Sequence, residues 1–538
     1  MYDYVIVGGG SAGCVLANRL SENPGTRVCL LEAGPADHSR LIHMPVGILG
    51  LMRSKKLNWA YWTEPQPQLN GRRLFCPRGK TLGGSSSINA MIYTRGHPSD
   101  YDRWAALGNR GWSYRELLPY FLRAQHCELG ADAYNGVGGP VNVAALRCVN
   151  PLSLDFVEAA VAAGYPRTPD FNGAEQTGVG LYRVAQRNGE RCSNAVAYLQ
   201  PARARPNLTV ITDAPATRIE FAGRRAVAVH YRQHGQDYRI EAEREVLLCG
   251  GAINSPQLLL LSGVGPREEL ERHGIVVVRE LPGVGRNLQD HLDISVVHRA
   301  RDRVGIAFTP LALPRALRGL WRYQRHRDGE FTSNYAEAGG FIPSQAGIEP
   351  ADLQMHFLPA IEEHHGLELR GLLRGYGYTL RTCYLRPASR GRVTLASADP
   401  LAPPRIDPNY LGDPTDLEPL VRAVKIARAI LDQSPLARHR RDELYPGPDV
   451  NSDEEIRAYV RARAETIYHP VGTCKMGHDD LAVVDDQLRV HDLEGLRVVD
   501  ASIMPTLVGG NTNAPTTAIA EKAADLILAA AAGEPLTA

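Results

Sequence analysis

This sequence of 538 residues lacks several features that would point to particular classes of protein. Its nine cysteines form no CxxC pair and no metal-ligand spacing, which predicts reduced thiols and no metal site. Lys+Arg 60 against Asp+Glu 59 leaves a net charge of +1, so no overall field recruits nucleic acid. No apolar run spans a bilayer, and no signal-peptide pattern precedes the first predicted strand. We expect a cytoplasmic protein, with contact to the inner face of the membrane left open.

The composition is that of a globular protein with a large core. Hydrophobic residues make up 44% and charged residues 22% of the chain, and its length favours two domains. Internal repeats are absent. The expected partner is a small molecule, and the sequence does not indicate an oligomeric state.

The first 32 residues predict a strand, a helix and a second strand. Apolar runs at 4–7 and 28–31 flank a helical pattern at 11–20, which together make one βαβ unit. Further strands are predicted at 208–212, 226–231, 245–248, 274–278 and 496–499, and helices at 255–261, 415–434, 453–464 and 515–532. This mixture indicates an α/β protein with added antiparallel sheet.

A glycine motif lies between the first strand and the helix. Gly8, Gly10 and Gly13 fit the G-x-G-x-x-G fingerprint, whose glycines allow a tight turn, close approach to a pyrophosphate, and close helix packing. Glu32 follows 22 residues after Gly10, where a carboxylate can bind ribose hydroxyls and would repel a 2′-phosphate. The motif therefore predicts a dinucleotide other than NADP, and leaves NAD and FAD open.

Four downstream segments carry further polar and glycine-rich patterns. Residues 79–89 offer backbone N–H groups and hydroxyls, and residues 251–265 form a strand-to-helix turn with a proline near the helix start. Residues 468–477 hold a histidine before a proline, and residues 499–515 lead through Gly-Gly-Asn into the last predicted helix. Each segment alone is also compatible with a purely structural loop.

Taken together, these segments resemble the glucose–methanol–choline (GMC) oxidoreductase family from the first strand to the last helix. The resemblance implies an FAD-binding Rossmann-like domain assembled from discontinuous segments, and a substrate domain with an antiparallel sheet flanked by helices. We assign residues 1–155, 190–298 and 465–538 to the FAD-binding domain. Residues 156–189 and 299–464 are assigned to the substrate domain.

The same resemblance implies which residues hold FAD. The expected set is Gly8, Gly10, Ser11, Ala12, Gly13, Glu32, Ala33, Gly83, Gly84, Ser85, Asn89, Ala90, Met91, Asp500, Ala501, Asn511, Thr512 and Asn513. Some choline-oxidising relatives attach FAD through a histidine, and the corresponding position here is Ile88. We therefore expect noncovalent FAD.

Alcohol oxidation needs a base for the hydroxyl proton and an acceptor for the hydride, which flavin supplies at N5. His469 is the expected base, because an imidazole exchanges protons near neutral pH and the loop of this histidine resembles the family's catalytic-histidine segment. Asn511 resembles the second member of the family's catalytic pair, and as an amide it can bind the substrate oxygen but cannot take the proton. The helix near Pro515 would aim its positive end at the reduced flavin.

The substrate is expected to be a primary alcohol, aliphatic or aromatic, oxidised to the aldehyde. Choline is the second choice, with Glu337 and Tyr335 as residues that could face a quaternary ammonium or equally serve in packing and salt bridges. His356 resembles a family histidine that contacts substrate. An alcohol oxidase producing hydrogen peroxide and a hydroxynitrile-lyase-like enzyme with structural FAD remain alternatives. The electron acceptor, whether a quinone, an electron carrier or oxygen, stays open.

Overall fold

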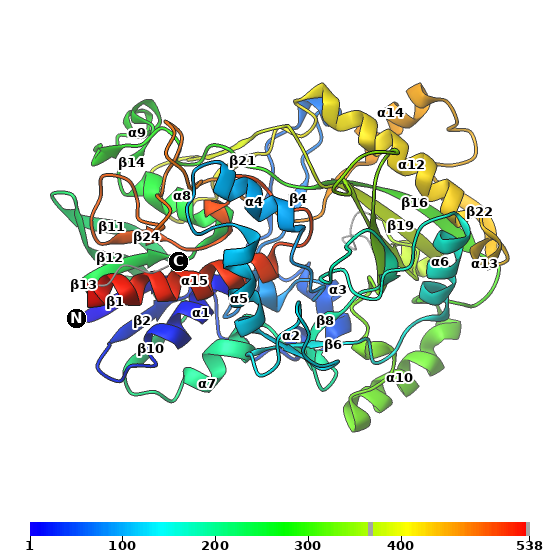
Figure 1. Cartoon of the computed structure of the whole chain (residues 1–538), viewed down its shortest axis with the longest axis horizontal. Coiled ribbons are helices and arrows are strands. Elements are labelled where there is room, and N and C mark those ends of the chain that lie inside the picture. The colour runs from blue at the N-terminus through cyan, green and yellow to red at the C-terminus, as the bar shows by residue number, and fades with distance from the viewer. Residues whose placement is uncertain (364–369, 534–538) are drawn as a thin grey trace.

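Two large sheets, one mainly parallel and one antiparallel, organise the chain (Figure 1). The computed structural model describes residues 1–363 and 370–533. The first sheet has the strand order β10-β2-β1-β13-β12-β11, and β24 pairs with β13. Its strands are β1 (Tyr2–Val7), β2 (Val28–Leu31), β10 (Leu208–Ile211), β11 (Ala216–Ala222), β12 (Arg225–Gln233), β13 (Gln236–Leu248) and β24 (Leu496–Val498).

The predicted βαβ unit forms the centre of this sheet. β1 and β2 are parallel, with Tyr4 opposite Val28, and helix α1 (Ser11–Leu20) connects them. Because α1 covers one face and the strands are buried on both, Tyr4–Val7 of β1 and all of β2 read as unbroken apolar runs. The prediction for this unit is confirmed.

The same sheet is completed by elements from the far end of the chain. β24 adds in parallel to β13, and helix α15 (Asn513–Ala532) lies along α1 (Figure 1). The buried Glu521 of α15 accepts hydrogen bonds from Arg19 of α1 at 2.8 Å and from the Tyr198 hydroxyl at 2.7 Å. The two ends of the chain therefore share one core.

The second sheet is antiparallel throughout and has the order β22-β16-β19-β18-β17-β7, with β23 paired to β16. Helices α6 (Pro151–Ala162), α12 (Leu417–Leu431) and α14 (Asp453–Arg463) pack against it (Figure 1). Its strands are β7 (Gly178–Leu181), β16 (Leu292–Ala300), β17 (Ala338–Ile342), β18 (Leu353–Leu358), β19 (Gly377–Tyr384), β22 (Arg440–Tyr445) and β23 (Glu465–Thr466). The predicted fold class is confirmed, while the exact domain boundaries stay a prediction.

Other helices connect or cover these sheets. They are α2 (Arg40–His43), α3 (Ile48–Leu51), α4 (Pro98–Ala106), α5 (Tyr114–Ala124), α7 (Gln200–Ala202), α8 (Gly251–Leu261), α9 (Arg267–Arg272), α10 (Leu313–His326), α11 (Arg370–Leu373) and α13 (Ser434–Ala437). Within the described residues, no helix has both the length and the apolar character needed to cross a membrane.

The strand predicted at 274–278 is wrong. This segment is a turn and an extended stretch after α9, and the only strand there is β15 (Arg279–Glu280), paired with the two-residue β14 (Val264–Gly265). Val276 is 83% exposed, because no neighbouring strand covers this segment. Its β-branched residues satisfy strand propensity, but propensity cannot supply a pairing partner.

Gly13 provides a test of the packing between α1 and the first turn. A Cβ added there would lie 1.9 Å from the carbonyl oxygen of Gly8, which is backbone and cannot rotate away. We expect Gly13→Ala to lower the free energy of unfolding by roughly 1–3 kcal/mol, measured by urea denaturation. Gly50→Ala is the control, since its Cβ would meet only the flexible tip of Leu41. Equal stability of the two variants would contradict this account of Gly13.

Candidate active site

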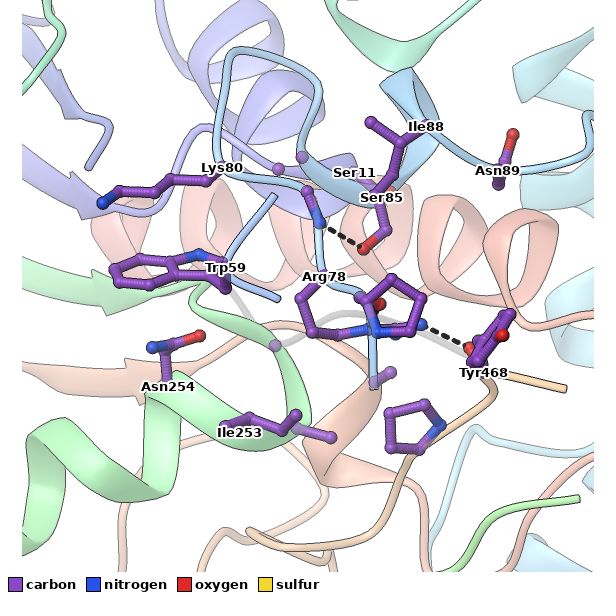
Figure 2. A pocket seen from close by; sticks show the side chains of 18 of the residues that line it. Ser11, Trp59, Arg78, Lys80, Ser85, Ile88, Asn89, Ile253, Asn254 and Tyr468 are labelled. Carbon is purple, nitrogen blue, oxygen red and sulfur yellow. Dashed lines mark hydrogen bonds between the residues drawn. The ribbon is translucent and has the colours of Figure 1, made fainter. Parts of the chain in front are cut away.

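A cavity of about 780 Å³ runs from the first glycine turn toward the antiparallel sheet. Figure 2 shows Ser85, Ile88 and Asn89 across this pocket from Ile253 and Asn254. Most of the predicted site residues line it: Gly8, Gly10, Ser11, Ala12, Glu32, Ala33, Gly84, Ser85, Asn89, Ala90, Met91, His356, His469, Asp500, Ala501, Asn511, Thr512 and Asn513. Gly13, Gly83 and Glu337 are not among the lining residues.

The glycines at one end form a bare backbone surface. A Cβ on Gly84 would lie 2.7 Å from the Cα of Gly10, so the two turns approach as closely as backbone permits. Gly83, with φ +86, stabilises this contact, because its N–H donates a hydrogen bond to the Gly9 carbonyl at 2.7 Å. A Cβ on Gly251 would meet nothing within 4 Å and would project into free space. Side chains here would occupy the room that a dinucleotide backbone needs.

Glu32 lies at the end of β2 and lines the cavity. Its carboxylate accepts hydrogen bonds from the backbone N–H groups of Gly9 and Gly34, both at 2.8 Å. Burial raises the pKa of Glu32 to about 7, against the opposing effect of these two bonds. The carboxylate is thus fixed beside the glycine turn, where it can accept further hydrogen bonds from ribose hydroxyls.

Asp500 joins the C-terminal segment to the start of α8. Its side chain accepts hydrogen bonds from the Gly251 N–H at 2.8 Å, the Ser255 hydroxyl at 2.6 Å and the Ser502 N–H at 2.8 Å. Burial raises the pKa of this carboxyl group. Asp500 therefore shapes the wall on which Ala501 and Gly251 lie.

Two further contacts connect distant segments around the cavity. The Asn513 amide donates to the Ser11 hydroxyl at 2.9 Å, which joins the start of α15 to the start of α1. The buried Arg191 donates to the Asn89 carbonyl at 2.7 Å and to its side-chain oxygen at 2.8 Å. Burial lowers the pKa of Arg191 to about 9. The starts of α1 and α15 thus present their positive ends to the cavity, where an anionic ligand is favoured, and Arg191 fixes Asn89 in the cavity wall.

His469 and Asn511 lie together at the other end of the cavity. The Asn511 side-chain oxygen accepts hydrogen bonds from Thr94 and Gln354, both at 3.0 Å. The amide nitrogen therefore faces His469, at 3.2 Å from Nε2. This arrangement assigns the lone pair of His469 to Nε2 and its proton to Nδ1, which lies 3.0 Å from Nδ1 of His291.

The surroundings of His469 disfavour a positive charge. Burial is the main cause that holds the pKa of His469 well below its usual value of 6.5, with contributions from His291, His356 and Arg78. Burial also lowers the pKa of His291 to about 3. Both rings are therefore neutral at neutral pH, and His469 presents an unprotonated nitrogen to the cavity.

The backbone around His469 is held by residues that the sequence analysis did not identify. The Asp290 side chain accepts from the His469 N–H at 2.7 Å, and Arg78 donates to the Tyr468 carbonyl at 2.6 Å (Figure 2). Tyr468 has φ +71, a conformation that a bulky residue adopts only when its neighbours enforce it. The polar run at 287–291, directly before β16, was the available signal for Asp290 and His291.

Glu337 needs a correction. Its carboxylate accepts hydrogen bonds from the Asn150 N–H and the Ser153 hydroxyl, both at 2.7 Å, and from Ser333 at 2.6 Å. The preceding Ala336 lines the cavity, and Glu337 holds the loop on its far side. These contacts favour a structural role for Glu337 over contact with a substrate.

A different acidic group lies in the cavity wall. Glu362 and Arg381 line the cavity and form a buried ion pair, and Arg381 also contacts the buried Asp293 at 3.1 Å. Tyr335 lies nearby in the wall, and burial raises the pKa of its hydroxyl. Among the described residues, no group of three or more potential ligands is placed to hold a metal ion.

The glycine surface and the fixed Glu32 suit a dinucleotide cofactor, and comparisons with known proteins identify the family. Residues 2–293 and 387–520 match the two domains of the GMC oxidoreductase family. The chain belongs to this family. Its members bind FAD and act on CH–OH groups, and the protein is an FAD-dependent oxidoreductase of that kind.

Similar proteins cover almost the whole chain. An alcohol dehydrogenase [acceptor] from Pseudomonas putida is 53% identical over 98% of this chain and 96% of its own length. The mitochondrial choline dehydrogenase of Homo sapiens is 48% identical over 98% and 89%. Among solved structures, pyridoxine 4-oxidase from Mesorbium loti is 35% identical, with a TM-score of 0.88 over 98% of this chain and 99% of that one.

The glycine surface, the fixed Glu32 and the donors at the starts of α1 and α15 fit FAD. Ile88 offers no nucleophile for a bond to flavin, and it lies in the cavity wall (Figure 2). We expect acid precipitation of the purified holoenzyme to leave all the yellow colour in the supernatant. Flavin that stays in the washed pellet, detected by its absorbance after proteolysis, would contradict noncovalent binding.

Proposed function

We propose that this protein oxidises a primary alcohol, aliphatic or aromatic, to the aldehyde, with His469 as the base. The observation that carries the proposal is the unprotonated Nε2 of a buried His469, held 3.2 Å from the Asn511 amide nitrogen. An alcohol oxygen within hydrogen-bond distance of both atoms would replace their direct contact, give its proton to Nε2 and accept a hydrogen bond from the amide. The alcohol dehydrogenase from Pseudomonas putida supports this choice of substrate.

Bound FAD supplies the acceptor for the hydride that leaves the carbinol carbon. His469 takes the hydroxyl proton while its Nδ1–H continues to donate to His291. Thr512 and Asn513 line the cavity where α15 begins, so the positive end of this helix faces it. Negative charge that develops in the cavity is stabilised by this helix end and by the imidazolium of His469.

Removal of the base tests the proposal. We expect His469→Ala to bind FAD normally but to slow flavin reduction by alcohol by at least about 100-fold, because the neighbouring Asn511 amide cannot take the hydroxyl proton in its place. Anaerobic stopped-flow absorbance measures this rate directly. His478→Ala, which changes an exposed histidine, should reduce at the wild-type rate. A wild-type rate in His469→Ala would remove His469 from the mechanism.

Three assays on the wild-type protein separate the alternatives. Failure of any alcohol to bleach the wild-type flavin would favour a lyase with structural FAD. Peroxide formed in air at the rate of alcohol turnover would identify an oxidase. Turnover that requires a quinone or dye would identify a dehydrogenase.

The low pKa of His469 sets the pH dependence. A base whose pKa lies below 6.5 stays unprotonated as the pH falls, so kcat/KM for a neutral alcohol should be constant from about pH 8 down to 6.5 and decline only below that value. Steady-state assays across this range measure the profile. A decline that begins above pH 7, with folded protein and bound FAD throughout, would contradict a depressed pKa for the base.

Choline is the second candidate. Glu362 and Asp293 place two carboxylates around the single guanidinium of Arg381, and aromatic Tyr335 lies in the same wall. An excess carboxylate and aromatic faces are what a quaternary ammonium requires. Choline dehydrogenases at 46–48% identity support it as well. A higher kcat/KM for choline than for uncharged primary alcohols would favour this candidate.

A further inference from the structure

Helix α10 (Leu313–His326) presents an apolar stripe to solvent. Leu313, Leu317 and Trp321 are spaced four residues apart, and they are 58%, 59% and 59% exposed. Side chains four apart on a helix lie on one face. In Figure 1, α10 projects at the edge of the molecule, away from β1 and its neighbours.

The stripe is not the face by which α10 packs onto the protein. Gly319 and Tyr323 are buried, a Cβ on Gly319 would lie 3.0 Å from the Phe331 ring, and the rings of Tyr323 and Phe331 are 6.4 Å apart. The helix therefore has one face that is covered and a second apolar face that is not.

The charge on this helix has a single sign. It contains four arginines, Arg315, Arg318, Arg322 and Arg325, and no carboxylate. From Arg299 to Arg327 there are eight arginines and one acidic residue, Asp302, although the whole chain carries only +1.

Two of the four arginines are neutralised and two are not. Arg315 pairs with Glu330, and Arg322 pairs with Asp328. Arg318 and Arg325 have no acidic partner in the part of the chain that the structure describes. At 100° per residue, both lie beside Trp321 at the border of the stripe.

Exposed apolar residues continue next to the helix. Phe308 is 42% and Leu373 is 62% exposed, and the Phe308 N–H donates to the Leu372 carbonyl at 2.9 Å. Ile306 packs against a cluster with Tyr335 and Leu358, which both line the large cavity. The apolar surface thus adjoins a wall of the active site.

We propose that this surface, made of Leu313, Leu317, Trp321, Arg318 and Arg325, binds the headgroup region of an anionic lipid bilayer. A leucine and tryptophan face bordered by arginines matches the boundary between acyl chains and anionic headgroups. A second copy of the same face would bring arginines of like charge together, whereas anionic lipid neutralises them. The proposal does not depend on which alcohol is oxidised.

Vesicle flotation tests the proposal with the FAD-loaded protein. Wild type should bind vesicles of phosphatidylcholine mixed with phosphatidylglycerol more tightly than vesicles of phosphatidylcholine alone. Leu317→Glu/Trp321→Glu and Arg318→Glu/Arg325→Glu should each weaken binding by at least about tenfold. Turnover of a dissolved alcohol with a soluble dye should stay unchanged, because neither pair touches the cavity.

Matched controls are available elsewhere on the surface. Val276→Glu changes a residue that is 83% exposed, and Arg110→Glu/Arg224→Glu reverses two exposed arginines. These variants should bind vesicles like wild type. Equal weakening by the control pair would show that net charge, and not α10, determines binding, and would overturn the proposal.

Tryptophan fluorescence adds a readout of position. Brominated lipids should quench the tryptophan emission of the wild-type protein. The control variant Trp62→Phe, which removes a tryptophan that is 51% exposed, should be quenched to the same extent. In Trp321→Phe this quenching should be lost. Absence of vesicle binding by wild type would overturn the proposal. The proposal would also be overturned if light scattering showed that the wild-type protein is a dimer and that Leu317→Glu/Trp321→Glu is a monomer with unchanged lipid binding.

Discussion

The carboxylate of Asp290 holds together the segments from which the catalytic end of the cavity is built. One oxygen accepts from the backbone N–H groups of His469 and His291, at 2.7 and 2.9 Å. The other accepts from the hydroxyls of Tyr410, at 2.6 Å, and Thr466. Burial raises the pKa of Asp290, and the hydrogen bonds oppose that rise. Four donors on one buried carboxylate make a rigid junction between β16, β23 and the His469 loop.

This junction explains why the base can be neutral and still well oriented. A partner carboxylate on the His469 ring would orient it but would also raise its pKa. Here Asp290 accepts hydrogen bonds from backbone N–H groups and hydroxyls and not from the His469 ring. Among the described residues, the ring forms hydrogen bonds with the neutral His291 and the Asn511 amide. Orientation comes from the loop, and the low pKa comes from burial.

How far the sequence predicts this structure depends on whether the signal is local. The βαβ unit followed from apolar runs and glycine spacing, because β1, α1 and β2 are consecutive in the sequence and β1 pairs directly with β2. His469 and Asn511 came from resemblance to a family, since nothing local distinguishes one histidine before a proline from another.

The residues that could not be predicted act through distant partners. Asp290 and His291 lie nearly 180 positions from the loop they hold, as the separations of 179 and 178 residues show. Glu337 could not be placed from the sequence for another reason. The three residues before it line the cavity, but its own carboxylate accepts hydrogen bonds from Asn150, Ser153 and Ser333, and the local sequence does not reveal these partners. The segment 274–278 has strand propensity but lacks a pairing partner along its length.

The shared core of α1 and α15 has a consequence for biosynthesis. β13 has no neighbour at the position of β24 until residues 496–498 are made, and Arg19 has no Glu521 to pair with before then. During translation the glycine turn after β1 emerges early, but the wall that faces it emerges hundreds of residues later. A growing chain therefore lacks this wall of the cavity, and the cofactor can be enclosed only after residues 500–516 have been made.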